Sequence, residues 1–271
     1  MEITDHKLSG AKQKQLPNGR IITPKFVIVH YTAGGTLNSS YNALKNRELS
    51  AHLLLDRDGK VVQMVDFNRR ALHAGESTWR GLKWLNSHAI GIEVCNYGWL
   101  LKRGDGKFQR PPKLGATPVF EPDKVIVADH KNGWPKGAGW EIYPEAQFTA
   151  LNSICEALLA AYPSIIDIVG HDDVSPARKQ DPGPAMAMDM LQTLLDARDP
   201  DRDDEFELYS VTAKSGLNMR TGPGTGNPVV RVLAFGEQVR GAPEGPEWVA
   251  LDLDGDGVAD GFASGRFLAL A

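Results

Sequence analysis

The sequence predicts an α/β domain with a mixed central β-sheet flanked by helices, followed by a small all-β barrel. Three observations support this prediction. Short β-branched runs mix with amphipathic helical patterns over residues 1–198. The acidic segment DPDRDDE then occupies residues 199–205, and residues 206–271 contain only short strand-like runs between Gly and Pro turns. We therefore expect a domain, a linker and a barrel with these three boundaries.

Apolar runs and helical faces place the elements of the first domain. The β-branched run KFVIVH at residues 25–30 is typical of a buried strand, and Asp58-Gly59 is a hairpin turn signal between the runs at 51–56 and 60–65. Pro144 suits the first turn of a helix whose apolar side chains recur on one face. We expect strands at residues 25–30, 51–56, 60–65, 89–94 and 165–169, and helices at 144–162 and 184–197.

Two other segments have different patterns. Residues 98–139 are rich in Gly, Pro, Trp and Lys with weak periodicity, so we expect this insert to be functional or mobile rather than structural. In the C-terminal segment, the spacing of apolar runs favours a small barrel. Its strands are expected around residues 208–212, 229–233, 238–240, 248–253 and 261–263.

Composition excludes several classes of protein. Hydrophobic residues make up 42% and charged residues 24% of the chain, which excludes a mainly disordered protein. No apolar run approaches the roughly 18 residues of a membrane helix, and the polar N-terminus lacks a Sec signal pattern. We therefore expect no membrane insertion and synthesis in the cytoplasm. The net charge of −4 includes no basic block, so nucleic acid is not an expected partner.

Two histidines and one aspartate have the pattern of a metal site. His30 ends a buried strand, and His171 follows the strand at 165–169 and opens a loop that contains Asp181. Two imidazoles and a carboxylate around an open position suit a catalytic zinc ion. From the residues alone an alternative stays open, in which the histidines pack in the core and Asp181 caps the final helix.

Six motifs in order resemble the zinc N-acetylmuramoyl-L-alanine amidases, which include anhydromuramyl-peptide amidases, phage endolysins and peptidoglycan recognition proteins. The motifs are FVIVHYTAGG, SAHLLLDRDGKVVQMV, LHAGES, AIGIEVCN, GWEIYPEAQ and VGHDDVSPARKQDPGP. They cover roughly residues 20–196 apart from the insert. The resemblance implies one zinc ion held by His30, His171 and Asp181. It also implies catalytic roles for Glu93 and Lys179.

Glu93 and Lys179 suit amide hydrolysis, although each has another interpretation. A carboxylate can take a proton from water and pass it to the leaving amine, and a fixed cation can stabilise an oxyanion. Otherwise, a Glu in an apolar strand needs an ion pair, because a lone buried carboxylate is costly. A lysine in a loop is otherwise simply solvated.

Weaker candidates surround these residues. The motifs that contain His52 and His73 recur near the substrate cleft of the family, and Tyr31 follows His30, so all three are expected substrate contacts. The alternatives are hydrogen-bonded structural histidines and a tyrosine packed on the sheet. Two loop residues, Asp173 and Arg178, are expected to brace the loop rather than react.

The C-terminal run GLNMRTGPGTGNPVVRVLAFGEQVR resembles the bacterial Src-homology-3-like barrels of wall hydrolases. This resemblance implies either peptidoglycan binding or a simple tethering role. The segment DLDGDGVAD also has the spacing of a calcium loop, although Ala263 stands where an EF-hand has its bidentate Glu. The alternative is an acidic turn. The expected calcium ligands are Asp252, Asp254, Asp256, Asp260 and the carbonyl of Val258.

Together these observations predict a hydrolase. It would use zinc-activated water to cleave the amide between N-acetylmuramic acid and L-alanine in peptidoglycan or muropeptides. Two alternatives are a non-catalytic peptidoglycan-binding or sensing protein and an amidase that acts on a different muramyl or acyl amide. The intact ligand set disfavours the first alternative. Release to the cell wall by a holin or another export route stays open, and the barrel favours intact peptidoglycan.

Overall fold

The computed structural model describes residues 1–111, 118–198, 206–253 and 259–271. The chain folds into two compact units, Met1–Leu195 and Asp196–Ala271, and each is described by itself. Within the described ranges, no helix combines the length and the apolar character needed to cross a membrane.

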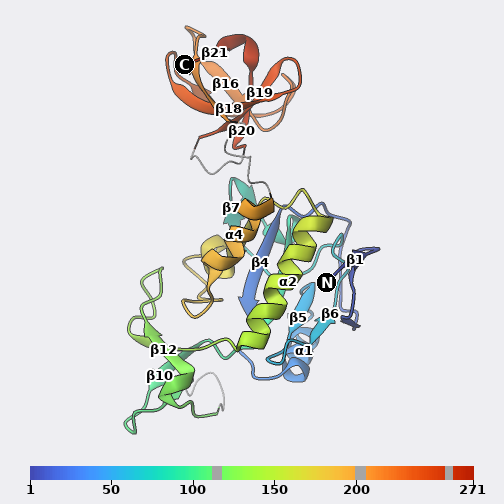
Figure 1. Cartoon of the computed structure of the whole chain (residues 1–271), viewed down its shortest axis with the longest axis vertical. Coiled ribbons are helices and arrows are strands. Elements are labelled where there is room, and N and C mark those ends of the chain that lie inside the picture. Colours follow the sequence, from blue (N-terminus) through green and yellow to red (C-terminus); the bar gives the residue numbers. More distant parts are fainter. Residues whose placement is uncertain (112–117, 199–205, 254–258) are drawn as a thin grey trace. The chain divides into compact units, whose positions relative to one another are not determined.

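A six-stranded mixed sheet forms the centre of the first unit (Figure 1). Its strands are β3 (Lys12–Gln13), β4 (Phe26–Tyr31), β5 (Leu53–Leu55), β6 (Val61–Gln63), β9 (Ala89–Val94) and β14 (Asp167–Gly170). Their order is β14-β4-β9-β5-β6-β3, and every pair is parallel except the β5–β6 hairpin. The predicted fold class is confirmed, and the hairpin strands are shorter than expected.

Side chains on the two faces of this sheet belong to different cores. On one face, Val27 and Val29 pack with the fully buried Leu151 and Leu158 of α2 (Glu145–Ala161). Figure 1 shows this helix lying across the sheet. On the other face, Ile28 packs with residues from the segment between β6 and β9. Because side chains alternate along a strand, His30 shares this second face with Ile28.

The other helices depart from the prediction. Helix α1 (Leu37–Asn46) was not expected because its sequence is mostly polar; the Thr36 side chain caps it by accepting a hydrogen bond from the backbone of Ser39. Helix α4 (Met188–Arg198) begins later than predicted, because residues 183–186 form a turn instead. The remaining short elements of this part are β1 (Ile3–Thr4), β2 (Lys7–Leu8), β7 (Thr78–Trp79), β8 (Leu82–Lys83), η1 (Leu85–Ser87) and α3 (His171–Val174).

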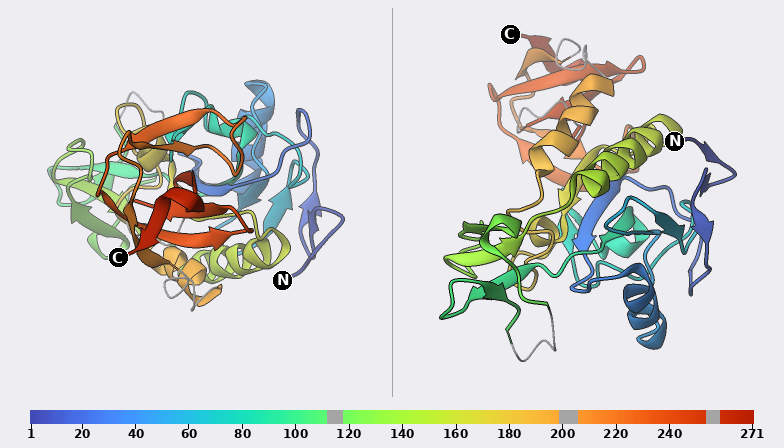
Figure 2. Two further views of the ribbon diagram at one scale, coloured as in Figure 1. Left: turned by 90° about the horizontal axis from the view of Figure 1, so that it is seen from above. Right: turned by 60° about the horizontal axis from the view of Figure 1, so that its bottom comes forward.

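The insert at residues 98–139 contains a second small sheet, so the expectation that it is not structural was wrong for its described residues. Its elements are β10 (Trp99–Lys102), β11 (Phe108–Gln109), η3 (Pro122–Lys124), β12 (Val125–Ala128) and β13 (Ala138–Glu141). The strands pair antiparallel in the order β11-β10-β13-β12. Figure 2 shows this green group beside the central sheet. Strands this short leave no alternating run in the sequence.

The second unit is a seven-stranded antiparallel sheet with its own apolar core. Its order is β17-β16-β20-β19-β18-β15-β21. The five expected strands are confirmed, and two further strands, β16 and β21, were not predicted as strands. The elements are β15 (Glu207–Val211), β16 (Leu217–Arg220), β17 (Val229–Leu233), β18 (Gln238–Glu244), β19 (Trp248–Asp252), β20 (Gly261–Ser264), η4 (Gly265–Phe267) and β21 (Leu268–Leu270).

The expected calcium loop falls largely outside the described residues, which exclude Asp254, Asp256 and Val258. Of the two described aspartates, Asp252 is buried at the end of β19. The carboxylate of Asp260 accepts a hydrogen bond from the backbone of Leu253 at 2.7 Å. The calcium site therefore stays a prediction. The expected linker at 199–205 likewise lies outside the described residues.

Candidate metal centre and cleft

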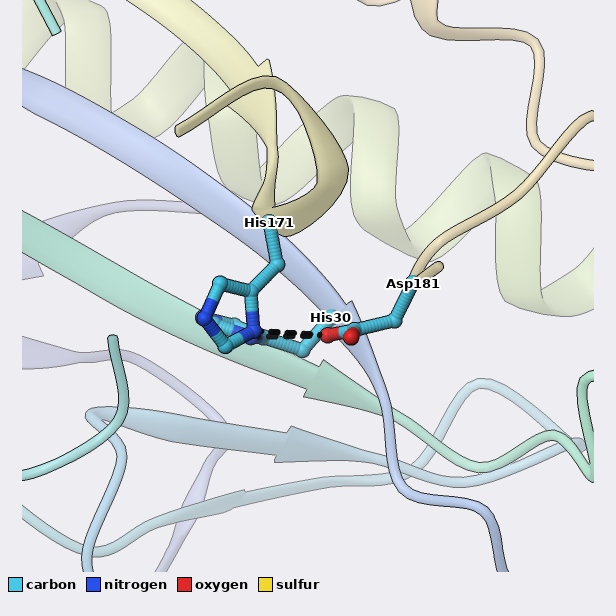
Figure 3. A group of neighbouring side chains, drawn as sticks. All are labelled: His30, His171 and Asp181. Carbon is cyan, nitrogen blue, oxygen red and sulfur yellow. Dashed lines mark hydrogen bonds and ion pairs between the residues drawn. The ribbon is translucent and has the colours of Figure 1, made fainter. Parts of the chain in front are cut away.

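His30, His171 and Asp181 meet beside the carboxyl ends of two parallel strands (Figure 3). The Nδ1 atoms of the two histidines lie 2.8 Å apart. Asp181 Oδ2 lies 3.1 Å from the Nδ1 atom of His30 and 2.9 Å from that of His171. All three residues are buried, with exposed fractions of 1%, 1% and 7%. Of the expected site residues, the structure thus brings together the three predicted metal ligands.

The geometry and chemistry of this cluster fit a metal ion. A tetrahedral ion bound at about 2.0–2.1 Å would hold its ligand atoms roughly 3.3 Å apart, close to the spacing found here. Burial, together with His171, lowers the pKa of His30 to about 4, so its imidazole is neutral and keeps a lone pair at neutral pH. Burial alone would raise the pKa of Asp181, but the two histidines outweigh it and hold that pKa well below its usual range.

Backbone contacts fold the loop after α3 back over the cluster. The Asp172 N–H donates to the Asp181 carbonyl at 2.7 Å, and the hydroxyl of Tyr143 donates to the carbonyl of Pro182. Asp173 accepts a hydrogen bond from the backbone of Gly170 at 2.8 Å. The expectation that Asp173 braces the loop is confirmed. Asp181 does not cap the final helix, which begins at Met188.

A second group of contacts ties this loop to the segment before β7. Arg178 donates through Nη2 to the carbonyls of Ala74 and Glu76, at 2.8 and 2.7 Å. Its predicted bracing role is therefore confirmed. The Ser175 hydroxyl donates to the same Glu76 carbonyl. The loop that contains Asp181 is thus fixed to a segment about a hundred residues earlier in the chain.

The cluster opens into a cleft of about 430 Å³. Glu93 and Lys179 both line this cleft, as do Tyr31 and His73. Glu93 is the direct neighbour of His30 in the β4–β9 register, which places its side chain on the same face of the sheet. None of the ion pairs among the described residues involves Glu93, so the structural salt bridge considered from the sequence is not found there.

Burial and the nearby Asp181 carboxylate raise the pKa of Glu93 to about 8, while Lys179 opposes the shift. A carboxyl group with a raised pKa in a cleft is typical of acid–base chemistry. The arrangement therefore places a cluster whose geometry fits a metal ion, a titratable carboxyl group and a lysine in one cavity.

His52 does not reach the cleft, so its expected substrate contact was wrong. The residue is fully buried. Its Nε2 lies 2.8 Å from the carbonyl of Arg69, and its Nδ1 accepts a hydrogen bond from the backbone of Gly91 at 3.0 Å. With both ring nitrogens bonded to the backbone, His52 is a structural histidine, the alternative that the sequence left open.

The insert contributes residues to the cleft that were not singled out from the sequence. Trp99 and Trp134 line it, with ring centroids 5.3 Å apart in an edge-to-face arrangement. Trp134 remains 56% exposed. Arg110 also lines the cleft, and its Nη1 donates to the carbonyl of Ala33 at 2.7 Å. The richness of the insert in tryptophan was the available signal, but without periodicity the sequence did not show which way these side chains point.

A family model described as N-acetylmuramoyl-L-alanine amidase matches residues 20–184. The 1,6-anhydro-N-acetylmuramyl-L-alanine amidase AmpD of Enterobacter cloacae is 32% identical over 148 residues, which cover 54% of this chain and 57% of AmpD. The N-acetylmuramoyl-L-alanine amidase AmiD of Escherichia coli (strain K12) is 31% identical over 201 residues, covering 70% of this chain and 59% of AmiD. The chain thus spans less than two thirds of the length of these curated relatives.

Similar solved structures include an AmpD derivative, with 23% identity and a TM-score of 0.49, covering 72% of this chain and 99% of that one. Another is E. coli AmiD in complex with anhydro-N-acetylmuramic acid-L-Ala-D-gamma-Glu-L-Lys. That match has 27% identity and a TM-score of 0.48, and it covers 65% of this chain and 58% of AmiD.

The raised pKa of Glu93 predicts that the free energy of unfolding of the metal-free wild type and of the Glu93→Gln variant depends differently on pH. The folded protein keeps a proton on Glu93 that the unfolded chain releases above pH 4.5, so stability is lost as pH rises toward about 8. Glu93→Gln removes this loss. The variant should match the wild type near pH 4 and exceed it at pH 8 by on the order of 1–3 kcal/mol. Urea unfolding in the presence of a chelator measures the difference.

The matched control is Glu156→Gln on the exposed face of α2, which should leave the pH profile unchanged. Parallel pH profiles for the wild type and Glu93→Gln would contradict the assigned environment of Glu93.

Proposed function

Because the chain belongs to the N-acetylmuramoyl-L-alanine amidase family, we propose that it hydrolyses the amide between N-acetylmuramic acid and L-alanine. The substrate would be peptidoglycan or its muropeptide fragments. The observation that carries this proposal is the buried cluster of His30, His171 and Asp181 in a cleft that Glu93 and Lys179 also line. The names of AmpD and AmiD describe the same bond, which supports the substrate class.

We propose zinc as the metal of this cluster. Two imidazoles and one carboxylate are a ligand set found in catalytic zinc sites, and three protein ligands leave a position for water or substrate. When bound, zinc lowers the pKa of its water to about 7 and polarises the amide carbonyl.

Glu93 acts in the proposed reaction as the group that moves the proton. In its ionised form it accepts a proton from the attacking water, and it then delivers that proton to the nitrogen of the leaving L-alanine. After burial, the Asp181 carboxylate is the second cause of the raised pKa of Glu93. A cation held by Asp181 would offset this negative charge and favour the ionised form.

Lys179 would act on the other side of the same bond. Its position two residues before the ligand Asp181 places it on the loop that folds over the cluster, and it lines the cleft. A fixed ammonium group there stabilises the negative charge that develops on the carbonyl oxygen. Tyr31 and the insert residues Trp99 and Trp134 would bind substrate along the cleft wall.

We further propose that residues 1–198 form the catalytic domain and residues 206–271 form a Src-homology-3-like barrel that binds peptidoglycan, with 199–205 as a linker. The separate apolar core and the all-antiparallel sheet of the second unit support this division. A peptidoglycan-binding unit favours intact wall over soluble fragments as the substrate, because it would hold the enzyme on the polymer.

Product analysis tests the proposed reaction. Intact sacculi and soluble anhydromuropeptides are incubated with the protein in parallel and analysed by mass spectrometry. The expected products are stem peptides with a free L-alanine amine and glycan with a free lactyl carboxylate. Binding to sacculi without release of peptide would instead indicate a non-catalytic binding protein. Release from a different amide would indicate another acyl substrate.

The metal assignment predicts about one zinc ion per chain, lost in His30→Ala, His171→Ala and Asp181→Ala. Each substitution removes one of the three clustered ligand atoms. Elemental analysis after dialysis measures the zinc content. The control His6→Ala changes an exposed histidine outside the cleft and should retain the metal. Full zinc content in His171→Ala would overturn the ligand assignment.

The assigned roles of Glu93 and Lys179 predict a loss of turnover without a loss of zinc. Glu93→Gln should lower kcat by roughly 100-fold or more, the usual scale of general acid–base catalysis. Lys179→Met should lower kcat because it removes the cation, whereas Lys60→Met changes an exposed lysine and should not. Near-normal kcat in either cleft variant would remove that residue from the mechanism.

The position of Trp134 on the cleft wall predicts that its removal weakens substrate binding and leaves the chemical step unchanged. Trp134→Ala should raise KM about threefold to tenfold with little change in kcat, as expected for the loss of an aromatic contact of about 0.5–1.5 kcal/mol. Trp84→Ala is the matched control, because Trp84 is 61% exposed and does not line the cleft. Equal KM values for the two variants would exclude Trp134 from substrate binding.

A further inference from the structure

The segment Leu72–Gly75 contacts both histidines of the metal cluster. The Nδ1 atom of His73 lies 3.0 Å from the Nε2 atom of His30. The carbonyl of the next residue, Ala74, lies 3.0 Å from the Nε2 atom of His171. In each case the contact uses the ring nitrogen opposite the one that joins the cluster. Figure 3 shows the two nitrogens of the His171 ring, of which one faces Asp181 and the other points away from it.

These contacts specify which nitrogen of each ligand carries a proton. A carbonyl oxygen only accepts hydrogen bonds, so the Nε2–H of His171 donates to Ala74 and its Nδ1 keeps a free lone pair. His30 has the same requirement, since its Nδ1 faces the cluster. Its Nε2–H then donates to Nδ1 of His73. Both imidazoles are thereby held in the tautomer that presents Nδ1 to a cation.

The segment that makes these contacts is itself held in place. The side-chain oxygen of Asn86 accepts hydrogen bonds from the backbone of His73 at 3.0 Å and of Ala74 at 2.8 Å. Arg178 donates to the same Ala74 carbonyl that accepts from His171. Below the ring of His73, a Cβ on Gly91 would lie only 2.4 Å from it. A glycine is therefore required there for the His73 ring to reach His30.

We propose that His73 and Ala74, clamped by Asn86, are positioning residues that orient both metal-ligating histidines and set their tautomers. This inference rests on the proposed zinc site and replaces the substrate contact expected of His73. One short segment thereby serves two ligands that come from opposite ends of the domain sequence. Partners of this kind commonly change metal affinity by about 10- to 100-fold, because they fix the ring and raise its basicity.

Zinc affinity tests the proposal without reference to catalysis. In His73→Phe the ring remains but the acceptor is lost, so the zinc Kd, measured by competition with a chromophoric chelator, should rise about 10- to 100-fold. His73→Asn returns an acceptor oxygen at the position of Nδ1 and should recover most of that affinity. Trp134→Ala is the matched control, since Trp134 lines the same cleft and should leave the zinc Kd unchanged.

Asn86→Ala provides a second, independent variant if His73→Phe fails to fold. It leaves both ligands and His73 in place but frees the segment, so it should also weaken zinc binding. Wild-type zinc Kd values in His73→Phe or, if that variant is unfolded, in a folded Asn86→Ala would overturn the proposal. A raised KM with unchanged zinc Kd in His73→Phe would return His73 to substrate binding.

His30→Ala separates this inference from the proposed function. Loss of zinc in His30→Ala with a normal zinc Kd in His73→Phe would reject only the positioning role. Retention of zinc in His30→Ala would instead reject the metal site on which both rest.

Discussion

The parallel pairing of β4 with β14 and with β9 is the constraint on which the candidate site depends. Parallel strands bring their carboxyl ends to one edge of the sheet, where functional groups gather in α/β proteins. His30 near the end of β4 therefore faces His171, which directly follows β14, and Glu93 near the end of β9. A one-residue shift in either register would move these side chains to the opposite face, where α2 packs.

One face of the sheet packs the main apolar core, and the other face holds the candidate site. One face packs apolar side chains against α2 and supplies the largest core of the unit. The other face has an apolar base, and its polar edge holds the histidines and carboxylates. Burying ionisable groups is costly unless they have polar partners, and here the Asp181 carboxylate lies within 3.1 Å of both imidazoles. The same burial shifts the pKa of Glu93 upward, which follows from the fold rather than from the residue itself.

Three segments that connect the strands complete the cleft. The loop after α3 contributes Asp181 and Lys179, and the segment Leu72–Gly75 contacts both ligand histidines. The insert adds an aromatic wall and is stabilised by a small core of its own. Arg178 links the first two segments through hydrogen bonds to backbone carbonyls. The sheet thus places His30, His171 and Glu93 at one edge, and the connecting segments surround them with the remaining residues of the cleft.

The strands and the main helix could be read from the sequence because their signals are local. KFVIVH, AIGIEV and the apolar face of residues 144–162 each depend on periodicity within one element, and the motif order indicated the ligand triad and the family. Helix α1 and the insert sheet escaped prediction, since polar composition and very short strands leave no such period. Only the tertiary structure decided which groups His52 and His73 contact. Both are histidines in motifs near the expected cleft, yet both ring nitrogens of His52 contact backbone groups, whereas His73 contacts His30. A side chain's partners depend on residues distant in the chain, and only the pairing of strands brings those residues together.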